Sequence, residues 1–215
     1  MKEALPIAVF ASGGGTNFQS LLDYEHKSSY NIVLLITDQQ NVGALERAEK
    51  SGKQTKVIKQ SGRSDQKIGL EIQSVLEESG IEFIVLAGYL KKIPDLVVSL
   101  YPRRIVNIHP ALLPSFGGKG MYGKYVHEAV LESEEKFTGP TVHYVDHDYD
   151  TGEIIAQVPV PVLDGDDWKT LGRRVLHAEH QLYPSIVDQL CKTVVAESEK
   201  GNKSIDQIQG THSSA

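Results

Sequence analysis

Residues 105–114, which read IVNIHPALLP, decide the fold and point to a functional site. The first residues are mostly apolar and predict a buried strand. Asn107 and His109 are two residues apart, so both side chains leave that strand on the same face. Pro110 cannot donate a hydrogen bond to a sheet, so the strand should end there. An amide and an imidazole therefore project from a strand's C-terminal end, where open parallel sheets bind ligands.

This pair of side chains has a definite chemical use. The amide of Asn107 can donate a hydrogen bond to a developing oxyanion, and the imidazole of His109 can give or take a proton near neutral pH. Taken alone, an Asn-x-His pair at a strand end is more often a local cap than a catalytic pair. A functional assignment therefore depends on other parts of the chain.

A glycine-rich turn near the N-terminus is the first of these parts. The apolar residues 6–11 predict a strand, residues 12–17 read SGGGTN, and a helix begins immediately afterwards. Glycines let a ligand approach the backbone, and the free N–H groups of a helix N-terminus favour phosphate. Phe18 occupies the place of the third glycine of a dinucleotide fingerprint, which argues against that motif. A phosphate site and a plain tight turn both remain open.

Strand and helix patterns alternate along the first half of the chain. Apolar runs at 31–37 and 83–87 and the short stretch 54–58 predict strands, and the stretches 42–51, 64–79 and 94–100 predict helices. This alternation predicts an α/β fold, a doubly wound and mostly parallel open sheet of about seven strands with helices on both faces. The glycine turn and the end of the 105–109 strand should then meet at one edge.

The second half of the chain completes one predicted domain. Strands are predicted at 139–145 and 154–160, a helix at 126–132, and a long helix from Trp168 that Pro184 could kink. We expect a single domain over residues 1–196, with a phosphate-binding half at about 1–100 and a catalytic half at about 101–196. Residues 197–215 are polar and are expected to form a disordered tail.

Composition limits the classes of partner. The chain has 215 residues, with 22 Lys and Arg against 28 Asp and Glu, and a net charge of −6. This balance disfavours nucleic acid as a partner. Cys191 is the single cysteine, which excludes an internal disulfide. No signal peptide and no membrane-spanning run is apparent, so a cytoplasmic protein is expected.

Two segments near the predicted site imitate other motifs. Residues 118–124 fit G-x-x-x-x-G-K, but Tyr125 stands where Ser or Thr must bind magnesium, so a mobile lid or substrate-binding loop is the better interpretation. Residues 146–152 read DHDYDTG, but their spacing does not fit a calcium loop. A zinc site at His143 and His147 lacks a third ligand. One of these acids could orient an imidazole, or the segment could be a solvated acidic turn; His143 could line the site or lie in the core.

Three motifs together resemble the folate-dependent formyltransferases. They are SGGGTN at 12–17, NIHPALLP at 107–114 and DYDTGEII at 148–155. The resemblance, strongest to family members that act on glycinamide ribonucleotide, implies a Rossmann-like enzyme of de novo purine biosynthesis. It would transfer a formyl group from 10-formyltetrahydrofolate to the amine of glycinamide ribonucleotide without a metal, as a monomer or homodimer. A non-catalytic phosphoribosyl sensor and formyl transfer to a sugar or tRNA are the alternatives.

The resemblance also implies roles for individual residues. Asn107, His109 and Asp150 match the catalytic triad: Asn107 would donate to the oxyanion, a protonated His109 would stabilise it, and Asp150 would raise the proton affinity of the imidazole. Arg63 lies near the place of a substrate-binding arginine, but the match is not clear. The ribonucleotide would contact Gly14, Gly15, Thr16, Asn17 and Glu179. The folate would contact Tyr89, Leu90, Lys91, Lys92, Ile93, Val145, Asp146, Asp148 and Asp150.

Overall fold

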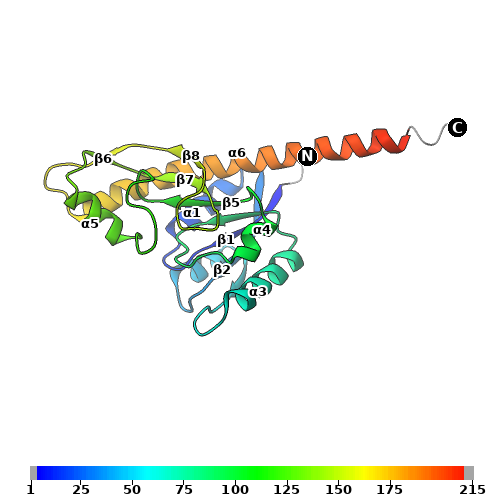
Figure 1. Cartoon of the computed structure of the whole chain (residues 1–215), viewed down its shortest axis with the longest axis horizontal. Helices are drawn as coiled ribbons and strands as arrows, with labels where there is room; N and C mark the ends of the chain where they lie inside the picture. The colour runs from blue at the N-terminus through cyan, green and yellow to red at the C-terminus, as the bar shows by residue number, and fades with distance from the viewer. Residues whose placement is uncertain (1–3, 211–215) are drawn as a thin grey trace.

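A seven-stranded sheet in the order β3-β2-β1-β4-β5-β7-β8 forms the centre of the molecule. The structure is a computed structural model that describes residues 4–210, with side chains through residue 199. Figure 1 shows the sheet and the helices around it. The strands are β1 (Leu5–Phe10), β2 (Tyr30–Thr37), β3 (Gln54–Val57), β4 (Phe83–Leu86), β5 (Ile105–His109), β6 (Phe137–Thr138), β7 (Thr141–Tyr144), β8 (Ile154–Gln157) and β9 (Val160–Pro161). The predicted fold class is confirmed.

Helices cover both faces of the sheet, as expected for strands that are apolar throughout. One face packs against α1, α2 and α6, and the opposite face packs against α3 and α4. α5 packs beside the start of α6, at the end of the molecule away from α3 (Figure 1). The helices are α1 (Thr16–Glu25), α2 (Gly43–Lys50), α3 (Asp65–Glu78), α4 (Asp95–Leu100), α5 (Lys124–Glu132) and α6 (Trp168–Gly210).

The direction of the strands changes at β5, and this change places the site. From β3 to β5 every pairing is parallel, whereas β7 pairs antiparallel with β5, and β8 pairs antiparallel with β7. Asn107 lies opposite Leu86 on one side and opposite His143 on the other. The polar residues at the C-terminal end of β5 therefore face a histidine of the neighbouring strand.

Helix α6 is anchored to the sheet by a buried tyrosine. The Tyr183 hydroxyl donates to the carbonyl of Leu86 at 2.8 Å and also lies 3.2 Å from the carbonyl of Val106. The tyrosine has no exposed surface. Because α6 crosses the strands next to the site, this contact fixes one wall of the site relative to β4 and β5.

Two details differ from the sequence-based prediction. The strand predicted at 154–160 is two strands, because β9 leaves the main sheet and pairs with the short β6. The long helix predicted from Trp168 is α6, which includes Pro184. Its backbone runs to Gly210, past the point where a tail was expected, and the prediction for 211–215 lies outside the described residues. Across 4–210, no helix has the length and apolar character to cross a membrane.

Candidate active site

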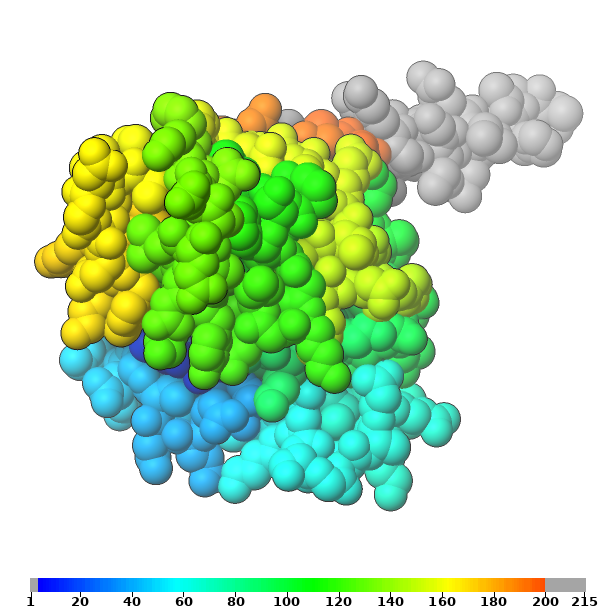
Figure 2. Space-filling view, turned by 60° about the vertical axis from the view of Figure 1, so that its left-hand side comes forward, coloured from blue at the N-terminus to red at the C-terminus, as the bar shows by residue number. Residues whose placement is uncertain are grey.

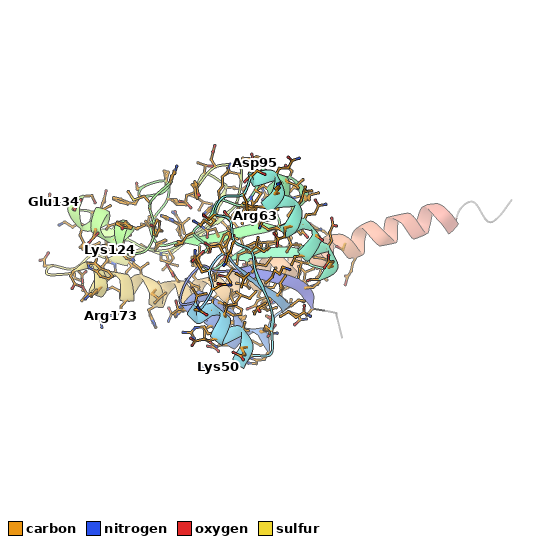
Figure 3. The ribbon with its side chains drawn as sticks, turned by 90° about the horizontal axis from the view of Figure 1, so that it is seen from below. Lys50, Arg63, Asp95, Lys124, Glu134 and Arg173 are labelled. Carbon is orange, nitrogen blue, oxygen red and sulfur yellow. The ribbon has the colours of Figure 1, made fainter. Side chains whose placement is uncertain are left out.

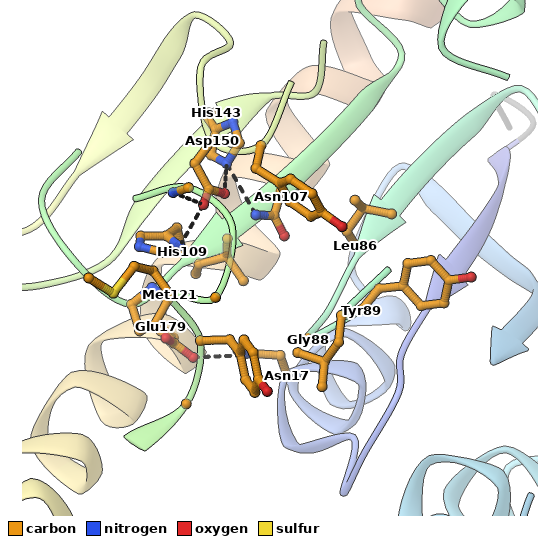
Figure 4. A pocket seen from close by; sticks show the side chains of 18 of the residues that line it. Asn17, Leu86, Gly88, Tyr89, Asn107, His109, Met121, His143, Asp150 and Glu179 are labelled. Atoms are coloured by element: carbon orange, nitrogen blue, oxygen red, sulfur yellow. Dashed lines mark hydrogen bonds and ion pairs between the residues drawn. The ribbon is translucent and has the colours of Figure 1, made fainter. Parts of the chain in front are cut away.

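Four polar side chains meet at the C-terminal end of β5. Asn107 and His109 come from β5, His143 from β7, and Asp150 from the loop between β7 and β8 (Figure 4). His109 Nδ1 lies 3.5 Å from Asp150 Oδ2, and His143 Nε2 lies 3.5 Å from Asp150 Oδ1. The three residues predicted as a catalytic triad are therefore brought together, and His143 stands between two of them.

The hydrogen bonds of His143 fix the orientation of Asn107. His143 Nδ1 lies 2.8 Å from the Tyr144 carbonyl, which can only accept, so Nδ1 carries the proton. Nε2 of the neutral ring is then an acceptor, and Asn107 Nδ2 donates to it at 3.1 Å. An amide nitrogen carries two hydrogens, so one N–H of Asn107 is left to point elsewhere in the site.

His109 is buried and bonded to the following loop. Its Nε2 donates to the Phe116 carbonyl at 2.8 Å, so in the neutral ring Nδ1 carries the lone pair that faces Asp150. Burial lowers the pKa of His109, while the Asp150 charge raises it by less, and the net direction is downward. The sequence prediction that Asp150 raises the proton affinity is correct for that one interaction, but burial outweighs it.

Asp150 is held as a carboxylate by several donors. The Gly118 N–H donates to Asp150 Oδ2 at 2.9 Å. The backbone of Asp150 adopts a positive φ of 58°. Burial raises the pKa of Asp150, but the 3.5 Å contact with His143 Nε2, the Gly118 hydrogen bond and the positive charge that either imidazole carries when it is protonated outweigh burial, so the pKa is lowered. The structure favours Asp150 over Asp146, whose Oδ1 accepts bonds from the Asp148 N–H and the Thr151 hydroxyl.

These side chains line one large cavity of about 1110 Å³. Lys124 and Arg173, also in its lining, lie at the end where α5 and α6 begin (Figure 3). In Figure 2 the segment around residues 110–130 (green) covers the middle of this face, with residues 40–75 (blue to cyan) below it. Every residue expected to contact the folate lines the cavity: Tyr89, Leu90, Lys91, Lys92, Ile93, Val145, Asp146, Asp148 and Asp150.

A second pair of buried polar groups lies on the opposite wall. Asn17 Nδ2 donates to Glu179 Oε2 at 2.6 Å, which joins the start of α1 to α6 (Figure 4). Burial raises the pKa of Glu179 to about 7, and the Asn17 bond lowers it only in part. Asn17 Oδ1 is buried without a hydrogen-bond partner. A polar ligand with a hydroxyl or amine could satisfy this oxygen.

The glycine loop lies beside the cavity rather than in its lining. Gly15 precedes α1 with φ 71°, and the first N–H groups of α1 have no partner within the helix. Of the residues expected at the ribonucleotide, Asn17 and Glu179 line the large cavity and Thr16 lines a smaller groove. Gly14 and Gly15 line neither.

Arg63 does not line the cavity. Its guanidinium donates to the Lys59 carbonyl at 3.0 Å and pairs with Glu71, and it is absent from the cavity lining. In Figure 3 the Arg63 label lies to the right of the Lys124 label, below that of Asp95.

Sequence reasoning missed the importance of two histidines. The sequence leaves His143 open between the wall of the site and the core, because its contact with Asn107 depends on the strand register. No motif marks His127 of α5, yet it is buried, lines the cavity and has an unpartnered Nδ1. Its ring lies so close to α6 that a Cβ at Gly172 would be 3.0 Å from His127 Cδ2.

Comparison with known proteins identifies the family. A model described as formyl transferase matches residues 5–187. The chain belongs to the formyl transferase family. A phosphoribosylglycinamide formyltransferase of Arabidopsis thaliana, named chloroplastic, is 45% identical over 199 residues, covering 91% of this chain and 68% of that protein. The trifunctional purine biosynthetic protein adenosine-3 of Bos taurus is 38% identical over 91% of this chain, which spans only 19% of that longer protein.

Solved structures agree with this family assignment. Glycinamide ribonucleotide transformylase 1 of Symbiobacterium toebii superposes with a TM-score of 0.83 at 33% identity, covering 90% of each chain. The transformylase 1 of Geobacillus kaustophilus gives 0.82 at 36% identity, covering 88% of this chain and 100% of the other. The predicted family and formyltransferase class of this chain are therefore confirmed.

Proposed function

We propose that this formyltransferase moves a formyl group from 10-formyltetrahydrofolate to the amine of glycinamide ribonucleotide, in purine biosynthesis. The observation that carries the proposal is the meeting of Asn107, His109 and Asp150 at the wall of one cavity, in a chain whose relatives bear the names given above. A sensor that only binds a phosphoribosyl ligand would leave this buried arrangement without a task.

In the proposed reaction the amine nitrogen attacks the formyl carbon. A C–N bond forms, the carbonyl oxygen becomes an oxyanion, and the bond from that carbon to N10 of the folate then breaks. The amine must lose one proton, and N10 must gain one. Neutral His109 can accept the proton at Nδ1, where the Asp150 carboxylate stabilises the imidazolium, and can return it to N10.

Asn107 serves the oxyanion in this scheme. One of its amide hydrogens is bonded to His143, and this bond holds the second where a developing charge can meet it. Because the partner nitrogen of His143 is an acceptor, the amide cannot turn its oxygen toward the histidine without losing the bond. His143 is therefore a positioning residue for the donor.

The two substrates take opposite walls of the cavity. The folate lies between the segment at Tyr89 and the loop at Asp150, both of which line the cavity. The ribonucleotide lies along α1 and α6, with its phosphate at the glycine loop and its ribose at Asn17 and Glu179. This chemistry calls for no metal. Within residues 4–210, no group of three or more His, Cys, Asp or Glu is arranged to hold one.

The direct test is an assay of the purified protein. Incubation with 10-formyltetrahydrofolate and glycinamide ribonucleotide should yield deformylated folate and formylglycinamide ribonucleotide in equal amounts, measured by mass spectrometry. Omission of the ribonucleotide is the control, because folate loss without it would indicate hydrolysis. Absence of the formylated ribonucleotide at saturating substrate would contradict the proposal.

We further propose a cytoplasmic enzyme that acts as a monomer or homodimer without nucleic acid or membrane. The negative net charge supports the absence of nucleic acid as a partner. The plant relatives are named chloroplastic, so location needs its own test by fractionation of the source cells. Light scattering of the purified protein decides between monomer and dimer.

A further inference from the structure

We propose that Arg47 of α2 is a positioning residue for phosphate: it turns the peptide groups of the glycine loop so that their N–H groups face the ligand. The proposal rests on the function given above for the identity of the ribonucleotide. It adds a residue from a different helix, with no place in the cavity that holds the triad.

Arg47 uses its guanidinium within the protein. Nε donates to the Gly14 carbonyl at 2.8 Å, and Nη1 donates to the Gln19 side chain at 2.9 Å. One arginine thus joins α2 to the glycine loop and to the first turn of α1. Because these donors are already occupied, the role of Arg47 is to set the loop rather than to grip the phosphate with the same atoms.

A second bond from α2 turns the neighbouring carbonyl in the same direction. The Ala44 N–H donates to the Gly13 carbonyl at 3.1 Å. In a trans peptide group the C=O and the N–H point in opposite directions. With the carbonyls of Gly13 and Gly14 turned toward α2, the N–H groups of Gly14 and Gly15 must point away from it. Two donors are therefore directed together, as an anion requires.

The loop and α2 also fit too closely for other side chains. A Cβ on Gly43 would lie 2.9 Å from the Gly14 carbonyl oxygen, and a Cβ on Gly15 would lie 2.8 Å from the Ala44 Cα. Gly15 also has φ 71°, which favours glycine. The loop therefore rests directly on the start of α2, and a change on α2 that moves the Gly14 carbonyl moves the phosphate donors.

The test compares three single variants with the wild type. Arg47→Met removes the bond to the loop, and Gly43→Ala pushes the same carbonyl without changing any charge. Lys50→Met is the matched control, because Lys50 is an exposed cation on α2 whose label lies at the outer end of that helix (Figure 3). Inorganic phosphate binding is measured by titration calorimetry, and the KM values for both substrates are measured by initial rates.

Arg47→Met and Gly43→Ala should each weaken phosphate binding and raise the KM for the ribonucleotide by about tenfold, the effect of one hydrogen bond from a charged donor. The KM for the folate and the turnover at saturation should stay within about twofold of wild type. Lys50→Met should leave all values near those of wild type. Arg47→Lys, which keeps a donor, should recover part of the phosphate affinity.

Unchanged phosphate affinity in Arg47→Met would overturn the proposal. So would an equal loss in Lys50→Met, which would indicate a general effect of charge. If Arg47→Met does not fold, the Gly43→Ala and Arg47→Lys results decide, and wild-type values in both count against the proposal. Phosphate binding needs no turnover, so a wild-type protein that binds phosphate but does not formylate the ribonucleotide would refute the proposed function and leave this one standing.

Discussion

Asp150 and Glu179 line the same cavity, and the structure shifts the pKa values of their carboxyl groups in opposite directions. Asp150 accepts a backbone hydrogen bond and lies within 3.5 Å of two imidazoles, and its pKa is lowered. Glu179 is more deeply buried and has one neutral donor, Asn17, so its pKa is raised to about 7. The number and charge of the neighbouring groups, and not burial alone, decide the direction in which each pKa is shifted. Asp150, whose pKa is lowered, suits proton transfer as a carboxylate, and Glu179, whose pKa is about 7, is more readily protonated and suits binding of hydroxyl groups.

The largest expected effect follows from removing the charge of Asp150. Asp150→Asn keeps the shape of the side chain but cannot stabilise the His109 imidazolium, so kcat should fall by roughly 10²–10⁴. Folate affinity, measured by fluorescence quenching, should change little. Lost folate affinity with unchanged kcat would reduce Asp150 to a binding residue and would break the contrast with Glu179.

Asn107→Ala should lower kcat by roughly 10²–10³, the usual loss for one oxyanion donor. His143→Phe leaves Asn107 in place but removes the acceptor that orients it, so a smaller fall in kcat, about tenfold, is expected with KM unchanged. Both are measured at saturating substrates. Near-normal turnover of Asn107→Ala would exclude the amide as the oxyanion donor.

The two carboxyl groups should also give opposite pH dependences of stability. The folded pKa of Glu179 is about 7 against an ordinary 4.5, so its contribution is complete below pH 4.5 and is lost as the pH rises through 7. The folded pKa of Asp150 is lowered from 3.8, so its contribution is present above that value and is lost as the pH falls.

Glu179→Gln should remove the first of these dependences. Relative to wild type, the variant should gain on the order of 3 kcal/mol in free energy of unfolding between pH 4.5 and about pH 8. Urea unfolding at several pH values measures the difference. A constant difference between the two proteins across this range would show that Glu179 keeps an ordinary pKa.

The smallest expected effect concerns the loop that packs against Asp150. A Cβ at Gly117 would lie 2.6 Å from Leu113 Cδ2 and 3.2 Å from Asp150 Cβ. Gly117→Ala should therefore cost about 1–3 kcal/mol of stability through overpacking and disturb the acid. Gly120→Ala, where nothing lies within 4 Å of the new Cβ but φ is 92°, gives for comparison the cost of backbone strain in the same loop, since Gly117 has no positive φ. Wild-type stability and turnover of Gly117→Ala would argue against a packing role.

Much of the fold could be predicted because it follows from local patterns. Strand and helix alternation gave the parallel half, and the position of Asn107 and His109 before Pro110 gave the end of β5. The partnership of Asn107 with His143 could not be predicted, because it depends on the register of an antiparallel strand that begins 32 residues after β5 ends.

The electrostatic states were also beyond the sequence. Burial raises the pKa of Glu179, and its hydrogen-bond partner Asn17 lies 162 residues away in the sequence. His109 was expected to gain proton affinity from Asp150, and only the depth of burial reverses the sum. Arg47 gave no signal, because its partner is a backbone carbonyl of the glycine loop. Motifs thus located the residues, while their ionisation depended on packing.

The loop after Pro114 forms hydrogen bonds with two of the proposed catalytic side chains. Its Phe116 carbonyl holds His109, and its Gly118 N–H holds Asp150. We infer that a substrate engaging either side chain must compete with the loop for the same atoms. Reciprocal linkage then applies: whatever displaces the loop raises the availability of the acid and base, and whatever protonates them changes the grip on the loop. Ligand entry and the release of His109 and Asp150 for reaction therefore depend on one equilibrium, between the loop bound to these side chains and the loop displaced from them.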